Sequence, residues 1–303
     1  MGDAIIAAFG LSKSFGSVQA LQDVDLEVPP GRIGLVGANG AGKTTLIRIL
    51  LGMLAPSDGS ARVFGIDAQR HPLGVRSRVG YMPEGDCFPP DQTAADFISY
   101  SAELGGLPSS ESRQRASEVL TLVGLAEERF RNLGEFSTGM KQRAKLAQAI
   151  VHSPDLVLLD EPASGLDPDG REDMLNLINR LSDFGMSVVF SSHVLSDIER
   201  TCDWVVMLNE GRLLRNEPLA EIQASNAVRV VVLDDPAPVV EALTTRGASV
   251  SVSDRTLEVV MDDADLFVMI RDILADTGVG LRSLGAKQAT LEDVYLAAEE
   301  FTE

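Results

Sequence analysis

"GANGAGKT", residues 37–44, is the stretch that decides the fold this sequence predicts. It follows the apolar run Ile33–Val36, which we expect to form a buried strand, and it leads into an apolar helix from about Lys43 to Gly52. The spacing G-x-x-x-x-G-K-[ST] between a strand and a helix is typical of a phosphate-binding loop, because glycines let backbone N–H groups converge on phosphate oxygens. A glycine-rich turn with the same spacing by accident is the alternative, which the flanking strand and helix disfavour. The loop therefore predicts an α/β fold of the P-loop NTPase type.

A second apolar run, Leu156–Leu159, ends in the adjacent carboxylates of Asp160 and Glu161. A wholly apolar run of this length is typical of a central parallel strand, and open α/β sheets bind ligands at the carboxyl ends of such strands. We expect Lys43 to reach the β- and γ-phosphates of a nucleotide, and Thr44 and Asp160 to hold Mg²⁺. Glu161 would polarise the attacking water, with a helix cap or a salt-bridge acid as the alternative role.

The composition fits a globular protein with an acidic surface. The chain has 303 residues, 45% of them hydrophobic, and a formal net charge of −19. That charge argues against broad nucleic-acid binding and against adhesion to anionic lipid. The two cysteines, Cys87 and Cys202, show no metal-binding spacing and favour a reducing compartment. The longest apolar stretch, around Leu46–Ala55, is too short to span a bilayer, so any membrane role is expected to come through a partner.

The chain changes character twice. Helical patterns dominate Thr93–Leu104, Ser110–Val123 and Thr138–His152, after which an α/β pattern resumes. A boundary is expected near Ala224–Asn226, followed by a small α+β domain of the split-βαβ, or ferredoxin-like, plan. Its expected strands are residues 228–233, 248–253, 256–260 and 280–284, and its expected helices are residues 237–246, 264–277 and 290–300.

The third of those helical patterns begins with small polar residues, in "EFSTGMKQR" at residues 135–143. Ser137 or Thr138 can cap the helix by accepting a backbone N–H of the first turn. The unpaired N–H groups at such a helix start, with Gly139 allowing close approach, can also bind a phosphate. The local sequence leaves both roles open.

The order of these motifs resembles the nucleotide-binding subunit of an ATP-binding cassette (ABC) transporter, over residues 4 to 224. "FSTGMKQR" stands where the family has its signature, whose commonest form is Leu-Ser-Gly-Gly-Gln; Phe136, Thr138 and Met140 depart from it. Such variants are common in single-cassette bacterial exporters of the ABC-2 type. "ASGLD" at residues 163–167 is similar to the family's D-loop, and "FSSH" at residues 190–193 resembles its switch histidine.

The resemblance implies roles for residues that spacing alone does not reveal. Ser137 and the N–H of Gly139 would contact the γ-phosphate of ATP held by a second copy, so the protein would be a homodimer with two composite ATP sites. His193 would sense the γ-phosphate, a surface or structural histidine being the alternative. Glu84 replaces the usual Gln of the Q-loop and would be a Mg²⁺ ligand. Phe15 would stack on adenine, with a core phenylalanine as the alternative.

The same resemblance implies an architecture and a function. Residues 1–224 would form the ABC ATPase domain, with a helical subdomain at about residues 86–153, and residues 225–303 would form an accessory or regulatory domain. The protein would hydrolyse ATP to energise export by a separate integral membrane permease, on the cytoplasmic face of the membrane, with residues 85–90 at the permease contact. A non-transport ABC ATPase in translation or DNA maintenance is the alternative, and a non-ATPase scaffold is a third possibility; no nucleic-acid partner is expected. The expected nucleotide-binding residues are Phe15, Gly37, Ala38, Asn39, Gly40, Ala41, Gly42, Lys43, Thr44, Thr45, Ser137 and Gly139; the expected catalytic residues are Glu161, His193 and Lys43, and the expected metal ligands are Thr44, Glu84 and Asp160.

Overall fold

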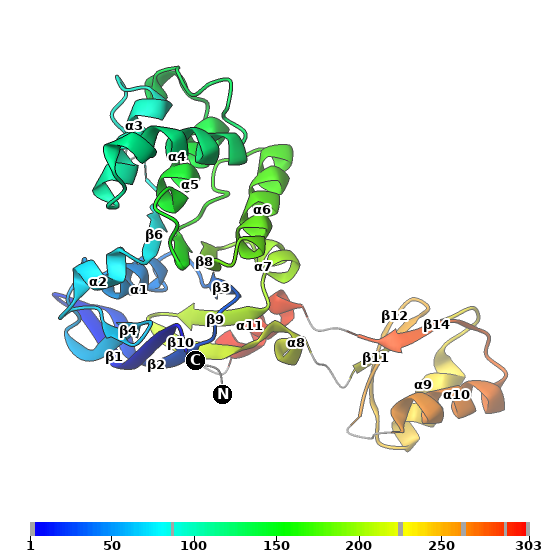
Figure 1. Ribbon diagram of the computed structural model, residues 1–303. Coiled ribbons are helices and arrows are strands. Elements are labelled where there is room, and N and C mark those ends of the chain that lie inside the picture. The colour runs from blue at the N-terminus through cyan, green and yellow to red at the C-terminus, as the bar shows by residue number, and fades with distance from the viewer. Residues whose placement is uncertain (1–3, 86–87, 224–226, 262–264, 288–289, 301–303) are drawn as a thin grey trace. The chain divides into compact units, whose positions relative to one another are not determined.

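The computed structural model describes residues 4–85, 88–223, 227–261, 265–287 and 290–300 (Figure 1). The chain divides into two compact units, Met1–Leu219 and Ala220–Glu303. The boundary that we expected near Ala224–Asn226 lies outside the described residues, as do residues 86–87 of the expected permease contact.

The first unit is built on a six-stranded sheet of order β10-β9-β3-β8-β7-β6. The five neighbouring strands β6, β7, β8, β3 and β9 run parallel, and β10 pairs antiparallel with β9 at the edge. Every residue of β7 and β8 is buried, as expected for parallel strands covered on both faces. The predicted α/β fold with a central parallel strand is therefore confirmed. The strands are β3 (Arg32–Val36), β6 (Val79–Met82), β7 (Leu156–Leu159), β8 (Ser187–Ser192), β9 (Trp204–Asn209) and β10 (Arg212–Pro218).

A smaller antiparallel sheet of order β2-β1-β4-β5 shares a core with α1. The apolar and β-branched content of residues 4–9 and 24–28 predicts a strand at each place, whereas β1 and β2 extend well beyond these ranges and meet in a tight turn at Gly16 (φ 59°). Both strands contain polar residues at partly exposed positions, and the β1–β2 register shifts repeatedly, so the apolar alternation fades along the sequence. The elements are β1 (Ile6–Phe15), β2 (Val18–Val28), α1 (Lys43–Leu50), β4 (Asp58–Val63), β5 (Ile66–Asp67) and α2 (Pro72–Arg76).

The three helices predicted between residues 92 and 152 are confirmed, and they form the upper lobe in Figure 1. Thr93 caps α3 by accepting the N–H of Asp96, and Asp167 caps α6 by accepting the N–H of Gly170. The elements are α3 (Ala94–Leu104), α4 (Ser109–Leu122), the short 3₁₀ helix η1 (Leu133–Glu135), α5 (Thr138–Ile150), α6 (Pro168–Asp183) and α7 (Leu195–Thr201).

The second unit has the predicted ferredoxin-like plan. Its antiparallel sheet has the order β12-β13-β11-β14. The helix after β11 and the helix after β13 therefore each connect two strands that have one other strand between them, as the split-βαβ motif requires. Helices α9 and α10 lie side by side and share a core with the sheet (Figure 1). No helix in the described ranges is long and apolar enough to cross a membrane. The elements are α8 (Leu219–Ile222), β11 (Ala227–Val232), α9 (Ala237–Thr245), β12 (Ser249–Ser253), β13 (Thr256–Val260), α10 (Leu266–Thr277), β14 (Leu281–Ala286) and α11 (Leu291–Glu300).

Candidate functional site

The loop between β3 and α1 has the backbone that its glycines predict. Gly42 stands at the N-cap of α1 with φ 104°, a left-handed conformation that side-chain-bearing residues rarely adopt. A Cβ atom there would also lie 2.5 Å from the carbonyl oxygen of Ala20. No side chain caps α1, so the backbone N–H groups of its first turn remain available to an anion.

The side chain of Lys43 is folded into this loop. Its ammonium donates to the carbonyl oxygens of Gly37 at 2.6 Å and Ala38 at 3.2 Å, and the residue is only 7% exposed. Its Nζ also lies 3.8 Å from Oε1 of Glu161. The loop therefore surrounds a buried positive charge beside the end of β7, where triphosphate oxygens would find a cation.

Asp160, at the end of β7, connects three segments of the site. Its Oδ2 accepts from the hydroxyl of Thr44 and its Oδ1 accepts from the hydroxyl of Ser191, both at 2.8 Å, and it is 1% exposed. The Ser191 Oγ in turn accepts the backbone N–H of Glu161 at 2.9 Å. Glu161 has φ 50°, so this hydrogen bond helps to hold it in a left-handed conformation.

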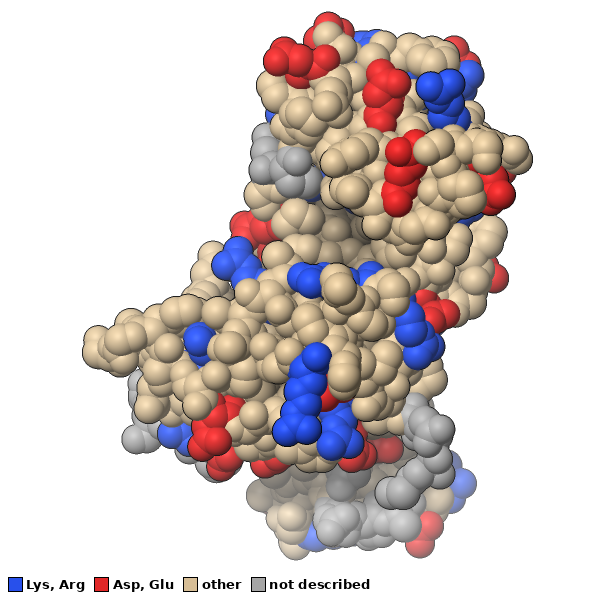
Figure 2. All heavy atoms as spheres, turned by 60° about the vertical axis from the view of Figure 1, so that its left-hand side comes forward, with Lys and Arg blue, Asp and Glu red and all other residues tan. Residues whose placement is uncertain are grey.

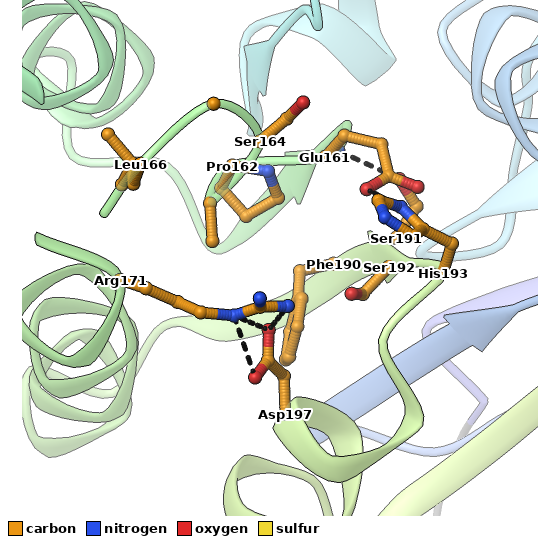
Figure 3. A pocket seen from close by; sticks show the side chains of 12 residues that line it. Glu161, Pro162, Ser164, Leu166, Arg171, Phe190, Ser191, Ser192, His193 and Asp197 are labelled. Carbon is orange, nitrogen blue, oxygen red and sulfur yellow. Dashed lines mark hydrogen bonds and ion pairs between the residues drawn. The ribbon is translucent and has the colours of Figure 1, made fainter. Parts of the chain in front are cut away.

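The carboxylate of Glu161 lies between Lys43 and His193. Its Oε2 is 2.9 Å from Nδ1 of His193, which extends from the loop after β8 (Figure 3). Its Oε1 is buried and has no hydrogen-bond partner among the residues that the structure describes. A buried carboxylate oxygen with unused acceptor capacity is suited to take a proton from a bound water.

Lys43, Asp160 and Glu161 line one hollow of about 290 Å³ at the carboxyl ends of the strands, whereas His193 does not line it. Gly37 and Ala41 belong to the loop but do not line the hollow, and the structure does not bring Phe15 to it. Phe15 lies half exposed at the end of β1, with Nζ of Lys13 5.1 Å from the centre of its ring. The lining residues are Ala38, Asn39, Gly40, Gly42, Lys43, Thr44, Thr45, Glu84, Asp160 and Glu161.

A second hollow of about 180 Å³ lies on the other side of Glu161 (Figure 3). Residues 162–166, which resemble the D-loop, form one wall, and residues 190–193 form another. The guanidinium of Arg171 in α6 pairs with the carboxylate of Asp197 in α7, with Nε 2.8 Å from Oδ2 and 3.0 Å from Oδ1. This pair joins the helix after the D-loop to the helix after His193.

The start of α5 has the cap that was one of its two predicted roles. The Oγ of Ser137 accepts the backbone N–H of Met140 at 3.3 Å. Ser137 and Gly139 are not among the residues lining the hollow of the same chain. Instead, the start of α5 lies against residues 163–167: a Cβ on Gly139 would be 3.7 Å from Leu166, and Nε2 of Gln142 donates to the carbonyl of Ser164 at 3.1 Å.

Comparison with known proteins places this geometry in a family. The sequence profile described as "ABC transporter" matches residues 21–164. The bacitracin transport ATP-binding protein BcrA of Bacillus licheniformis is 37% identical over 241 residues, 76% of this chain and 78% of that protein. The daunorubicin/doxorubicin resistance ATP-binding protein DrrA of Streptomyces peucetius is 32% identical over 301 residues, 96% of this chain and 91% of that protein. The chain belongs to the ABC transporter ATP-binding proteins.

A solved structure of the ATP-binding subunit of an ABC transporter supports the same fold. The two structures match with a TM-score of 0.65 and 29% sequence identity, and the match covers 72% of this chain and 92% of the solved one. This ABC subunit therefore binds and hydrolyses ATP, and its relatives are transport proteins rather than translation or DNA-maintenance factors. On the face drawn in Figure 2, Lys and Arg form several separate groups, and Asp and Glu are also present.

The hollow of the ABC subunit suits a hard divalent cation beside the nucleotide. The Thr44 hydroxyl and the Asp160 carboxylate are in contact, and Glu84 lines the same hollow, so the donors are oxygens, as Mg²⁺ prefers. Across the described ranges, no cluster of three or more His, Cys, Asp or Glu side chains forms a metal site by itself. Mg²⁺ characteristically keeps such a small protein ligand set and completes its shell with substrate phosphates and water.

Three features of the site in this ABC subunit were not predicted from the sequence. Ser191 draws attention in the sequence only as a neighbour of His193, although residues 187–191 have a strand pattern and its place at the end of that strand is a usable signal. The Arg171–Asp197 pair spans 26 residues and belongs to no motif. Lys145 lies in a run of helical residues whose pattern is that of an ordinary amphipathic helix.

Proposed function

We propose that two copies of this ABC subunit close over two Mg·ATP molecules and thereby energise export through a separate integral membrane permease. The observation that carries the proposal is the division of the site. The phosphate loop, Glu84, Asp160 and Glu161 line one hollow, whereas Ser137 and Gly139 begin a helix that contributes nothing to that lining. A second copy related by a two-fold axis would bring its Ser137 and Gly139 to the γ-phosphate, and the symmetry would make two equal sites.

Each residue of the hollow has a role in this proposal. Lys43 exchanges its loop carbonyls for β- and γ-phosphate oxygens, and Thr44, Asp160 and Glu84 hold Mg²⁺, which neutralises charge on the phosphates. Glu161 accepts the proton of the attacking water at Oε1, which has no hydrogen-bond partner among the described residues.

His193 orients Glu161 through the contact at 2.9 Å and reports the presence of the γ-phosphate. Phe15, half exposed at the end of β1, stacks on adenine. Loss of the γ-phosphate removes the contact that joins the two copies, so hydrolysis reopens the dimer.

Transport is assigned to a separate chain, in keeping with the relatives named for bacitracin transport and for daunorubicin and doxorubicin resistance. Resistance to a drug favours export, and the permease would hold this subunit on the cytoplasmic face of the membrane. Residues 1–224 would act as the ATPase domain, with residues 86–153 as the lobe that contacts the permease, and residues 225–303 as an accessory or regulatory domain.

The test is a trapped dimer. Glu161→Gln preserves the shape of the side chain but removes the base, so this variant is expected to bind Mg·ATP, to hydrolyse it at least about a hundredfold more slowly and to elute as a dimer. Gel filtration with light scattering, with and without Mg·ATP, measures the mass. A variant that hydrolyses ATP at the wild-type rate, or that stays monomeric at saturating Mg·ATP, contradicts the proposal.

A further inference from the structure

Lys145 is buried in α5 and holds the loop that carries Glu84. It is 2% exposed, and its Nζ lies 3.0 Å from the carbonyl oxygen of Pro83, 2.7 Å from that of Glu84 and 3.4 Å from that of Gly85. These three consecutive carbonyls belong to the loop after β6. Hydrogen bonds from a charged donor are stronger than neutral ones, and burial removes the competition of water, so the contact is a strong tie between α5 and this loop.

Lys145 links two parts of the structure that serve different parts of the ATPase cycle, the loop that carries Glu84 and the helix α5. The side chain of Glu84 lines the hollow of its own chain. Helix α5 begins at Thr138, and Ser137 caps it about 12 Å along the helix axis from Lys145. A rigid helix carries a displacement at one end to the other, so a shift of the Glu84 backbone on nucleotide binding would move the helix start that faces a second copy.

A second contact points the same way. Gln142, one turn before Lys145, donates to the carbonyl of Ser164, which follows the catalytic strand β7. Helix α5 is therefore attached to the loops that leave the carboxyl ends of both β6 and β7. Close packing also leaves no room between β6 and α5, because a Cβ on Gly80 would overlap the carbonyl of Ala149.

We propose that Lys145 is a positioning residue that couples the nucleotide hollow of one chain to the signature end of α5. Binding of Mg·ATP at Glu84 restricts the movement of the backbone of residues 83–85. Because Lys145 holds this backbone, the movement of α5 is restricted as well. In the dimer of the proposed function, on which this last step rests, the transfer links the two composite sites, so ATP bound at one site promotes closure at the other.

Hydrogen exchange tests the coupling without requiring a dimer. The background is Ser137→Arg, which keeps the chain monomeric under the proposed function, and light scattering records the mass. In this background, saturating Mg·ATP is expected to slow exchange of the backbone amides of residues 141–150 at least about fivefold, the lower end of the usual range for coupled sites. Adding Lys145→Met, which keeps the aliphatic stem and removes the ammonium, should reduce that effect to less than about twofold. Lys145→Arg, which keeps a cation of similar reach, should restore part of it.

Two further measurements separate coupling from simple stabilisation. Affinity for Mg·ATP in the monomeric background should stay within about twofold, whereas in the otherwise wild-type chain Lys145→Met should lower the Hill coefficient of ATP hydrolysis from near two towards one. A purely structural lysine would lower the unfolding temperature and leave the nucleotide-induced slowing of exchange intact, which overturns the proposal. If Lys145→Met does not fold, Lys145→Gln takes its place, with the same loss of slowing expected.

The outcomes for the two proposals remain distinct. Dimerisation of the Ser137→Arg chain with Mg·ATP contradicts the composite site, yet the exchange comparison still decides whether Lys145 couples Glu84 to α5. Conversely, suppose that the Glu161→Gln dimer is trapped normally and that Mg·ATP slows amide exchange in the Lys145→Met chain as much as without that change. This result upholds the proposed function and rejects the coupling.

Discussion

The imidazole of His193 is 2.9 Å from the carboxylate of Glu161, although 32 residues separate them and they follow different strands. The contact occupies one carboxylate oxygen, whereas the other, Oε1, is buried 3.8 Å from Nζ of Lys43 and has no hydrogen-bond partner among the described residues. His193 thus fixes the direction in which Glu161 can accept a proton.

Replacing this histidine should damage the chemical step and spare binding. His193→Ala is expected to lower kcat about a hundredfold, the usual scale for disturbing a general base, with KM for ATP changed less than about threefold. Steady-state ATPase assays measure both constants. The exposed His71→Ala serves as the control and should behave as wild type. A large increase of KM at unchanged kcat would assign His193 to ground-state binding instead.

Ser191 should be important for both stability and turnover. Its buried hydroxyl donates to Asp160 and accepts from Glu161, so Ser191→Ala leaves two polar groups unpaired and is expected to cost about 1–3 kcal/mol of unfolding free energy. Urea denaturation measures the cost, and ATPase activity should fall with it because Asp160 loses a fixed partner. Ser192→Ala is the matched control, since among the described residues its hydroxyl forms hydrogen bonds only with the backbone of the neighbouring Val194. Equal behaviour of the two variants would refute the role of Ser191.

Ser137→Arg should prevent dimer formation while Mg·ATP still binds to the monomer. The long cation would fill the space that the partner's γ-phosphate needs, and it also removes the cap of α5, worth about 1 kcal/mol. Ser137→Ala removes the cap without the bulk and controls for that loss. Combining each change with Glu161→Gln and measuring mass by light scattering separates the effects. A Ser137→Arg chain that dimerises like Ser137→Ala would contradict the trans contact.

Stability should fall with acidification through His152. Burial lowers the pKa of its imidazole below the ordinary value of 6.5, and its Nε2 has no hydrogen-bond partner among the described residues. The unfolded chain therefore binds a proton more readily than the folded chain. The contribution of the neutral imidazole is complete above pH 6.5 and is lost as pH falls below it towards the lowered pKa of the folded state.

The variant His152→Leu cannot take up that proton, so its stability relative to wild type should improve as the solution is acidified below pH 6.5. Urea titrations of both proteins across that range give the difference. His71 and His193 are common to both chains and cancel in the comparison. A difference that does not change with pH would show that His152 has an ordinary pKa.

Cys202 should resist thiol reagents while the protein is folded. Burial raises the pKa of its thiol well above 9.0, and the reactive form is the thiolate. In a Cys87→Ser chain, where Cys202 is the remaining cysteine, labelling by an aromatic disulfide near pH 8 is expected to be at least about tenfold slower than in denaturant. Equal rates before and after unfolding would mean that the thiol is accessible.

The sequence predicted those parts of the fold and site that depend on residues close together along the chain. Residues 37–44 and the Asp160–Glu161 pair carry their chemistry in a short spacing, and a buried strand such as Leu156–Leu159 needs apolar residues at every position. The ferredoxin-like order of the second unit followed from alternating patterns for the same reason.

The rest depends on partners that are distant along the chain. Ser191 gains its role from Asp160, and Lys145 gains its role from three carbonyls about sixty residues earlier. No local pattern distinguishes a lysine that will be buried against carbonyl groups from one that will face water. The full length of β1 and β2 was missed because their pairing, rather than their apolar content, sustains them.

The carbonyl groups of Gly37 and Ala38 that hold the ammonium of Lys43 keep the loop in its working shape before any substrate arrives. Capturing ATP then requires one side chain to change partners, and no segment has to become ordered. In the proposed dimer, the rate of nucleotide exchange would accordingly be set by how fast the two copies separate, because the phosphate loop is already held by Lys43.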